Sequence, residues 1–283
     1  MTDNAVKTDG KLLLCATPIG NLGDVTERVA AALKDADAVF CEDTRNSGVL
    51  LNKLGVRNRL FSMHEHNEER EAEHIASLVA EGKTVAYVSD AGMPCISDPG
   101  ARLVRVFIEK GLPFTVLPGA SASLTAAILS GLGTDRIYFA GFLPRENRER
   151  TELLSEIRRV RATVVIYESP YRAAETLREL KEIMGDRDAA LVREITKLFE
   201  ETKRGKLSEL YEIYRENAPK GECVIVVSGA QGNEKPEESL DEMLLRLMRG
   251  GMSAKDASKQ AALVLDIPKA DAYSRANELK NEL

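Results

Sequence analysis

The stretch that decides the fold is SDAGMPCISDPGARLV, residues 89–104. It lies between an apolar run, residues 84–88, and an apolar pattern with helical spacing. A connection between a strand and a helix usually needs about two to six residues. This one is longer, and it holds glycine, proline and aspartate, which favour turns and allow a backbone to approach a ligand closely. Taken alone, the stretch is equally consistent with an ordinary long loop and with a ligand-binding loop.

Short β-rich runs alternate with amphipathic helical stretches on both sides of this loop. In the first part of the chain the predicted strands are residues 11–17, 38–41, 60–63, 84–88 and 114–117. In the second part they are residues 137–142, 162–168, 189–195 and 222–229, with a basic turn after residue 195 and a helix at 207–215. This alternation predicts an α/β fold with a largely parallel sheet covered on both faces.

The predicted organisation is two α/β domains followed by a helical region. Residues 1–118 form the first predicted domain and residues 119–230 the second, because the alternation of strands and helices begins again after Pro118-Gly119. The polar segment 231–239 is a predicted linker, and 240–283 is predicted to be wholly helical. Within that region Ser253 is a predicted N-cap, and Ile267-Pro268 separates the last two helices. Two short helices of this kind resemble a helix-turn-helix, and a small capping bundle is an equal alternative.

Composition and charge limit the class of protein. A length of 283 residues suits roughly two domains. The net charge of −6 is unlike that of a typical nucleic-acid binder, whose affinity rests on lysine and arginine. Locally, eight arginines fall within residues 136–172, and a second basic group follows at 197–206. These groups permit a polyanionic partner, although helix-surface ion pairs explain many of them equally well.

Other features of the composition indicate a cytoplasmic protein. The first ten residues are polar and do not resemble a signal peptide, and no apolar run approaches the roughly 20 residues that cross a bilayer. The four cysteines are far apart, and three of them lie in or beside strand-like runs, as reduced, core-packed thiols do. Three histidines between residues 64 and 74 have no cysteine pair beside them, so we expect no metal site.

Four elaborated loops each follow a strand-like run and precede a helix. They are TPIGNLGD (17–24), SDAGMPCISDPG (89–100), LPGAS (117–121) and YESPYR (167–172). Ligands of open α/β sheets bind at the carboxyl ends of strands, so these loops predict a site in a cleft between the domains. The first loop is a poor dinucleotide fingerprint, since it has only Gly20 and Gly23 and is interrupted by Pro18. Glu42 and Asp43 nevertheless lie at the end of a predicted strand, a position from which an acid often hydrogen-bonds the ribose of a dinucleotide. A nicotinamide-dependent oxidoreductase therefore remains an alternative.

Seven motifs in order resemble the tetrapyrrole methylase superfamily, and specifically its ribosomal RNA branch, the small-subunit rRNA cytidine-2'-O-methyltransferases. They are ATPIGNLGD, EDTR, SDAGMPCISDPG, LPGASA, GFLPR, YESPYR and REITK, and the resemblance covers about residues 12–229. It implies two α/β domains, S-adenosylmethionine as cofactor, and methylation of the ribose of a decoding-region cytidine (cytidine 1402) in 16S rRNA. It also implies a homodimer and the small ribosomal subunit as partner. A tetrapyrrole methyltransferase and a non-catalytic RNA-binding module are the alternatives.

The resemblance assigns the cofactor to loops of both domains. Residues near its methionine and ribose portions would be Ser89, Asp90, Ala91, Gly92, Met93 and Ile96, and the wall at the domain junction would be Pro118, Ser121 and Ala122. Tyr167, Glu168 and Ser169 would approach the adenosine through apolar contact and main-chain hydrogen bonds. For Asp98 we expect a structural role, in which its side chain or the turn itself caps the helix that follows.

Methylation of a ribose hydroxyl defines which residues the reaction needs. The hydroxyl has a pKa far above neutrality, so it must be aligned with the methyl group and must lose its proton to an acceptor. Strand alternation in REITK predicts that Glu194 and Thr196 lie on one side, with Lys197 at the start of the next turn. We expect Glu194 or Asp43 to accept the proton, and Lys197 and Arg45 to orient the RNA. The equal alternative is that Glu194 and Arg193 only form structural ion pairs.

The helix SASLTAAILSGL, residues 121–132, is rich in small side chains that allow close packing against a neighbouring surface. It is a modest indication of a homodimer, because a junction within one chain would use the same kind of helix. Basic side chains in the C-terminal helices, such as Lys255 and Arg275, indicate that these helices contribute to substrate docking. Acids interleave with them, so a structural cap is the competing interpretation.

Overall fold

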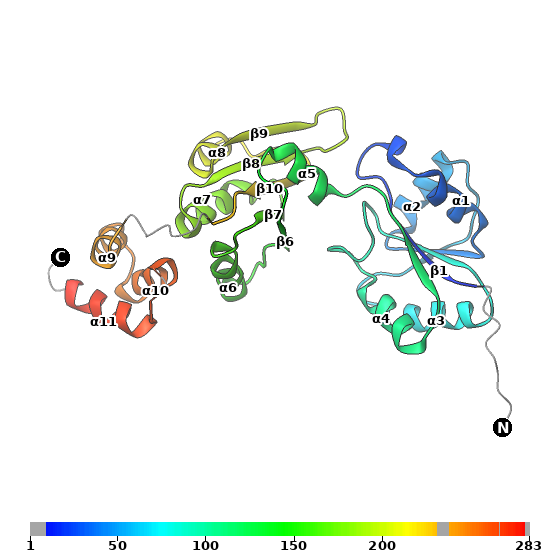
Figure 1. Ribbon diagram of the computed structural model, residues 1–283, viewed down its shortest axis with the longest axis horizontal. Helices are drawn as coiled ribbons and strands as arrows, with labels where there is room; N and C mark the ends of the chain where they lie inside the picture. Colours follow the sequence, from blue (N-terminus) through cyan, green and yellow to red (C-terminus); the bar gives the residue numbers. More distant parts are fainter. Residues whose placement is uncertain (1–9, 231–237, 266, 281–283) are drawn as a thin grey trace, which may run out of the picture. The chain divides into compact units, whose positions relative to one another are not determined.

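The structure is a computed structural model, and it describes residues 10–230, 238–265 and 267–280. Within these residues the chain forms two compact units. One consists of Met1–Thr125 together with Glu194–Glu200, and the other of Ala126–Arg193 together with Glu201–Leu283. Helix α5 (Ala122–Ser130) begins in the first unit and ends in the second. Figure 1 labels the helices of both units, strand β1 and the strands of the second sheet.

The first unit is built on a five-stranded sheet with the order β3-β2-β4-β1-β5. Its strands are β1 (Leu12–Cys15), β2 (Ala38–Cys41), β3 (Leu60–Ser62), β4 (Val85–Val88) and β5 (Phe114–Leu117). All four neighbouring pairs are parallel, and Leu12 pairs with both Val85 and Phe114. The carboxyl ends of all five strands therefore lie at the same edge of the sheet.

Helices cover both faces of this sheet, as predicted (Figure 1). Helices α1 (Glu27–Asp35) and α2 (Thr44–Lys53) pack on the face that presents Leu13, Val39 and Val88. Helices α3 (Glu68–Ala80) and α4 (Ala101–Lys110) pack on the opposite face. Because successive side chains of a strand point to opposite faces, a strand buried on both faces must be apolar throughout, which explains runs such as LLLC and AVFC.

The second unit contains a mixed sheet with the order β6-β7-β10-β8-β9. Its strands are β6 (Ile137–Phe142), β7 (Thr163–Glu168), β8 (Asp188–Arg193), β9 (Glu201–Lys206) and β10 (Cys223–Val227). Only β6 and β7 are parallel; β10 runs antiparallel to β7 and β8, and β9 runs antiparallel to β8. The prediction of a largely parallel sheet is wrong here, because a fully buried strand reads as an apolar run whichever way its neighbours run.

Strand β9 is also a correction, since the sequence predicted a basic turn in this region. Its sequence ETKRGK is polar because β9 lies at the edge of the sheet, and its side chains are mostly exposed or half-buried. Edge strands commonly carry charged residues that discourage pairing with another chain. Helices α6 (Asn147–Arg158), α7 (Ala173–Met184) and α8 (Leu207–Tyr214) share an apolar core with one face of the sheet, centred on Ile166, Leu191 and Ile225.

The C-terminal region is helical, as predicted. It consists of α9 (Leu240–Arg249), α10 (Ala254–Leu265) and α11 (Lys269–Lys280), which share a small apolar core. The Ser253 hydroxyl accepts a hydrogen bond from the backbone of Asp256 at 3.1 Å, so Ser253 caps α10 as predicted. Most of the predicted linker, residues 231–237, lies outside the described residues. The fold class is thus α/β with a small helical region at the end.

The cysteines have the environment that the sequence predicted. Cys15, Cys41 and Cys223 are buried and none of the four is in a disulfide. Burial raises the pKa of Cys15 to about 12, so this thiol stays protonated at neutral pH. Among the helices of the described residues, none has the length and apolar character needed to cross a membrane.

Candidate functional site

The loops after β1 and β4 are joined by main-chain hydrogen bonds. The amide of Thr17 donates to the carbonyl of Gly92 at 2.8 Å, and the amide of Gly92 donates back to Thr17 at 3.1 Å. The Thr17 hydroxyl also donates to the carbonyl of Ser89 at 3.2 Å. Two of the four loops singled out in the sequence are therefore held together at the carboxyl edge of the first sheet.

The loop after β2 joins the same edge through Asp90. Its carboxylate accepts hydrogen bonds from the backbone of Asp43 at 3.2 Å and from the side-chain amide of Asn46 at 2.7 Å. The loop after β5 approaches from the other side: a Cβ atom on Gly119 would lie 2.8 Å from the Cβ of Ala16. Only glycine permits that approach, since real Cβ atoms do not come so close. The loops after β1, β2, β4 and β5 thus form one connected edge.

Residues 89–100 form a loop with several left-handed backbone conformations. Gly92 and Gly100 have positive φ, and so do Cys95 (φ 70°) and Ser97 (φ 62°), which is uncommon for residues with side chains. Cys95 packs against the core beside Tyr87, in agreement with a packing role rather than thiol chemistry. Such strained positions cluster at ligand sites. This unusually long loop therefore has a defined conformation with several left-handed residues.

Of the two expected ways of capping α4, the Asp98 side chain is wrong, whereas the turn does supply the N-cap residue, Gly100. Helix α4 is preceded by Gly100, and the backbone amides of Gly100 and Arg102 both donate to Oε1 of Glu68, each at 2.9 Å. Glu68 begins α3, 32 positions earlier than Gly100. A cap supplied from a distant helix leaves no local signal in the sequence, whereas an aspartate before the helix gives a strong but misleading one.

Asp98 instead belongs to a group of acids at this edge. Burial, with the nearby charge of Glu42 next, raises the pKa of Asp98 to about 6, while the Ser89 hydroxyl acts in the opposite direction. Burial and the charge of Asp90 likewise raise the pKa of Glu42. A cavity of about 370 Å³ opens here, and its lining residues are Glu42, Asp43, Thr44, Arg45, Ser62, His64 and Asp90. No pattern in the sequence indicates that Asp98 and Glu42 influence each other.

The REITK motif reaches the first unit through residues 194–200. The backbone amide of Asn21 donates to the Thr196 hydroxyl at 3.1 Å. A Cβ atom on Gly20 would lie 2.6 Å from Cγ of Lys197 and 2.8 Å from that hydroxyl. The structure therefore brings Lys197 and Thr196 to the loop after β1, against a glycine that makes room for them.

The conformation of this segment differs from the expected strand. Strand β8 ends at Arg193, and both Glu194 (φ 52°) and Thr196 (φ 65°) are left-handed. Alternation along a strand therefore does not place these two side chains, and that prediction is wrong. A β-branched threonine in this region is a genuine outlier, and strain of this kind persists only where surrounding contacts enforce it. One such contact is the hydrogen bond from the Thr196 amide to Glu200 at 2.7 Å.

Glu194 and Lys197 form an ion pair across this turn. The Lys197 ammonium donates to Oε1 of Glu194 at 2.9 Å. Their side chains are 19% and 30% exposed, so both are accessible yet partly shielded from water. A partly shielded carboxylate can accept a proton, and a partly shielded ammonium can hold an anion more strongly than one in bulk water.

Asp43 and Arg45 form a second pair, with different properties. The Asp43 carboxylate accepts from the backbone and from the guanidinium of Arg45, with the shortest contact, to Nη2, at 2.6 Å. These hydrogen bonds lower the pKa of Asp43 to about 2. A carboxylate with so low a pKa is a weak base, so Asp43 is poorly suited to accept a proton. The Arg45 side chain is 88% exposed, which leaves its outer face open to a partner.

In the second unit, the predicted residues Tyr167, Glu168 and Ser169 lie at the end of β7 and the start of the loop after it. Glu168 is 3% exposed. Its carboxylate accepts from the Ser169 backbone at 2.8 Å and from the Thr176 hydroxyl at 2.7 Å. Both oxygens are thus engaged inside the unit. Glu168 holds the loop in place, and a ligand would meet the main chain here rather than this carboxylate.

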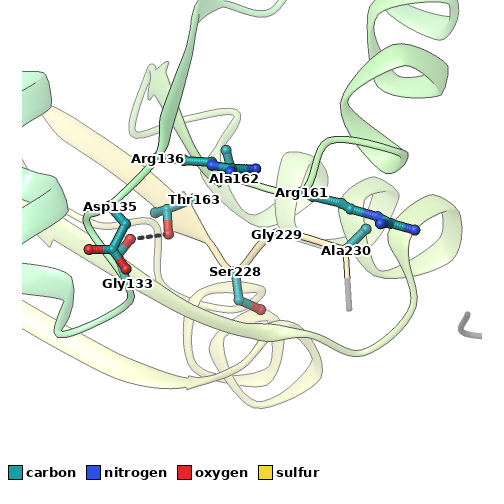
Figure 2. A pocket seen from close by; sticks show the side chains of 9 residues that line it. All are labelled: Gly133, Asp135, Arg136, Arg161, Ala162, Thr163, Ser228, Gly229 and Ala230. Atoms are coloured by element: carbon teal, nitrogen blue, oxygen red, sulfur yellow. Dashed lines mark hydrogen bonds between the residues drawn. The ribbon is translucent and has the colours of Figure 1, made fainter. Parts of the chain in front are cut away.

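A larger cavity, of about 510 Å³, lies elsewhere in the second unit (Figure 2). It is found where β6 and β7 begin and β10 ends, which is the edge of the sheet opposite to the loop that carries Ser169. Its lining residues are Gly133, Asp135, Arg136, Arg161, Ala162, Thr163, Ser228, Gly229 and Ala230. None of the residues predicted for cofactor or catalysis is among them. The predicted site residues therefore point to the loop edge of the first unit rather than to this cavity.

Comparison with known proteins decides the family. Residues 11–211 match the family described as Tetrapyrrole (Corrin/Porphyrin) Methylases. The chain belongs to this family. As a tetrapyrrole methylase, it is a methyltransferase that uses S-adenosylmethionine, and a nicotinamide-dependent oxidoreductase is no longer an alternative.

Relatives of this tetrapyrrole methylase extend over nearly the whole chain. A protein of Halalkalibacterium halodurans named Ribosomal RNA small subunit methyltransferase I is 43% identical over 271 residues, which are 94% of each chain. A protein of the same name from Streptococcus pyogenes serotype M1 is 40% identical and covers 96% of each chain. Among solved structures, the methyltransferase CobJ is similar with a TM-score of 0.60 and 22% identity, covering 78% of this chain and 95% of its own. That likeness supports the fold of the methylase.

The chemistry of the loop edge fits the cofactor of this family. S-adenosylmethionine carries a sulfonium cation, a polar amino-acid end and a flat base. The edge offers carboxylates at Glu42, Asp90 and Asp98, free space beside them and the exposed apolar side chain of Ile96. Carboxylates attract a cation and apolar side chains accept the carbon skeleton, so this donor set is compatible with the cofactor.

Proposed function

We propose that this protein transfers a methyl group from S-adenosylmethionine to the 2'-hydroxyl of a decoding-region cytidine in 16S rRNA. The observation that carries the proposal is the identity of about 40% over nearly the full length of both chains with proteins named Ribosomal RNA small subunit methyltransferase I. The tetrapyrrole-methylating neighbours are 19–20% identical and support the fold alone. A ribosomal RNA substrate therefore has more support than a porphyrin.

In this proposal the cofactor is held by the loop edge of the first unit and by the loop after β7. Ser89, Asp90, Ala91, Gly92, Met93 and Ile96 contact its methionine and ribose portions, and Pro118, Ser121 and Ala122 form the wall beside them. Support comes from the hydrogen bonds that join these loops, such as those between Thr17 and Gly92. Tyr167, Glu168 and Ser169 serve the adenosine, with Glu168 acting through the main chain because its carboxylate is engaged.

The cofactor supplies an electrophilic methyl group when it is bound, and the protein has to prepare the hydroxyl. Glu194 accepts the proton of the ribose 2'-hydroxyl as the new bond forms. Lys197, 2.9 Å from Glu194, holds a neighbouring phosphate and stabilises the developing negative charge on the oxygen. The left-handed turn at Glu194 and Thr196 supports this assignment, because the hydrogen bond from Asn21 to Thr196 holds the turn beside the loop after β1.

Asp43 and Arg45 orient the RNA in this scheme. The Asp43 carboxylate holds the Arg45 guanidinium in one orientation through several hydrogen bonds. A guanidinium fixed in this way binds a phosphate bidentately with less loss of side-chain freedom. Asp43 is thus an orienting residue, and Glu194 is the stronger candidate for the proton acceptor.

The substrate, the assembly and the location follow from the same proposal. Assembled small ribosomal subunits are the substrate rather than naked RNA, because an acidic protein gains little from non-specific attraction to phosphates. The protein acts as a homodimer in the cytoplasm, and its C-terminal helices contribute to docking on the subunit. A chain shortened to about residue 232 then keeps its cofactor affinity and loses activity on subunits.

The deciding experiment is methylation of small subunits from a strain that lacks the enzyme. With labelled S-adenosylmethionine, we expect label on one cytidine in the decoding region, and resistance to alkaline cleavage at that nucleotide identifies the 2'-oxygen. Label on a base, or only on an added porphyrin, contradicts the proposal. Sedimentation at micromolar concentration tests the homodimer, which a purely monomeric protein would rule out.

A further inference from the structure

Three aromatic rings meet at the end of β6 and β7 because of an irregularity in β6. Residues three apart in a regular strand point to opposite faces of a sheet. The pairing of β6 with β7 shifts register between Phe139 and Gly141, and Gly141 has φ 67°. The shift turns Phe142 to the same face as Phe139, and both rings contact Tyr167, at centroid distances of 5.5 and 4.8 Å. Bulges next to functional sites commonly redirect a side chain in this way.

The outer surface of this cluster is open. Phe142 is 58% exposed, although aromatic rings of this size are usually buried. Tyr171, in the loop after β7, is 89% exposed. Arg145 is also exposed, and no ion pair connects it to any of the described residues. Phe142, Tyr171 and Arg145 are thus exposed side chains at the end of β6 and in the loops after β6 and β7. Exposed rings together with a guanidinium form the combination with which proteins bind unstacked nucleotides.

The two loops that carry these side chains are tied together by buried charges. The Arg172 guanidinium donates to the carbonyl of Leu143 at 3.1 Å, and it pairs with Glu168 at 3.4 Å. Arg150, which is 8% exposed, donates to Glu179 at 2.7 Å and to Thr176 at 2.9 Å. The loops after β6 and β7 are therefore fixed in advance, and binding loses less entropy on a fixed surface.

We propose that Phe142 and Tyr171 form a stacking platform for a base of the substrate RNA at or next to the target cytidine, with Arg145 on the adjoining phosphate. This inference rests on the proposed function, and it adds the residues that recognise the nucleotide. A nucleotide held out of its stack on an aromatic side chain has its ribose fixed in position, which helps to align the 2'-hydroxyl for reaction. An aromatic face binds such a base whatever its identity, because every base has a π-face.

The test uses the absence of tryptophan from the chain. Phe142→Trp introduces a single fluorophore at the platform, and Ile213→Trp introduces one on α8, where Ile213 is 48% exposed. We expect a single-stranded oligoribonucleotide with a central cytidine to quench the first variant and leave the second unchanged. S-adenosylmethionine alone should quench neither. Quenching of Phe142→Trp by the cofactor alone would mean that the ring serves the adenine, and this would overturn the proposal.

Kinetics on unmethylated small subunits provide the second measurement. Phe142→Ala should raise KM about tenfold, which is within the loss of affinity expected when one stacking ring is removed. The Kd for S-adenosylmethionine should be unchanged. Phe142→Tyr and Phe142→Trp should restore KM, which a loss of folding would not allow, and Ile213→Ala should have no effect. A KM unchanged in Phe142→Ala overturns the platform. If the wild type leaves subunits unmethylated, the proposed function fails, and quenching by the oligoribonucleotide still decides whether the platform binds RNA.

Discussion

The loop edges of the two units are held by different kinds of interaction. In the first unit, main-chain contacts dominate: Thr17 and Gly92 exchange two backbone hydrogen bonds, and Gly119 lies against Ala16. In the second unit, the loops after β6 and β7 are held by buried side chains, chiefly Arg150 and Glu168. The first arrangement depends on small residues and backbone conformation, whereas the second depends on charges that must stay paired. Substitutions should therefore affect the two edges through different mechanisms.

The largest effect is expected in the turn that meets the first edge. Glu194→Gln and Lys197→Ala should slow turnover about a hundredfold, the low end for a general acid–base residue, with normal binding of S-adenosylmethionine. Single-turnover methylation of small subunits measures the rate, and calorimetry measures cofactor binding. Glu200→Ala is the control, because Glu200 holds the Thr196 backbone without belonging to the ion pair. An equal loss in Glu200→Ala would assign the effect to the shape of the turn, and near-wild-type rates in Glu194→Gln and Lys197→Ala would refute the catalytic assignment.

The second prediction tests the buried charges of the other edge. Arg150→Met should lower the free energy of unfolding by about 3 kcal/mol, because it leaves the carboxylate of Glu179 without its cation and removes one hydrogen bond to Thr176. Arg178→Met removes two ion pairs from the same helix region, but its side chain is 37% exposed, so we expect a loss of less than about 1 kcal/mol. Urea unfolding compares the two variants. Equal losses would mean that burial does not distinguish these charges.

The third prediction tests the reliance of the first edge on glycine. Gly20→Ala places a Cβ atom against Lys197, Thr196 and the carbonyl of Ile195, so residues 194–200 must shift. We expect a turnover about tenfold lower, with a smaller loss of stability of about 1 kcal/mol. Gly48→Ala is the matched control, since its new methyl would make only an ordinary contact with Leu60, and alanine favours the α2 helix. Wild-type turnover in Gly20→Ala would contradict the prediction, because it would show that residues 194–200 can shift without slowing the reaction.

The same contrast explains which features could be predicted from the sequence. Local patterns predicted the strands of the first sheet, the helices and the cap at Ser253, because each depends on neighbouring residues. Strand β9 and the antiparallel direction of β10 were missed, since edge position and strand direction are set by partners far along the chain. The sequence motifs also identified residues that lie together at one edge of the first sheet, such as Asp43 and Asp90, which are connected by a hydrogen bond. The cap from Glu68, the left-handed turn at Glu194 and the raised pKa of Asp98 arise only from tertiary contacts.

The smallest predicted effect concerns Asp98, whose negative charge at the first edge lowers the stability of the folded protein. Its ordinary pKa is 3.8, and burial followed by the charge of Glu42 raises the pKa to about 6 in the folded protein. A carboxyl with a raised pKa binds its proton more tightly when folded. The folded state is therefore unaffected below about pH 4, becomes progressively less stable as pH rises from 4 to 6, and carries the full cost above that range.

Asp98→Asn removes this cost, so it should stabilise the protein most at pH 7–8. After allowance for solvent screening of a group that is only partly buried, we expect a gain of about 1 kcal/mol, which fades as pH falls toward 4. Asp37→Asn should show the opposite sign, because a hydrogen bond from the Thr84 backbone lowers the pKa of Asp37 and stabilises the fold at neutral pH. Urea unfolding of both variants and the wild type between pH 5 and 8 measures the difference. A gain for Asp98→Asn that does not change with pH would come from packing or hydrogen bonding. It would contradict the prediction that ionisation of the Asp98 carboxyl destabilises the folded protein.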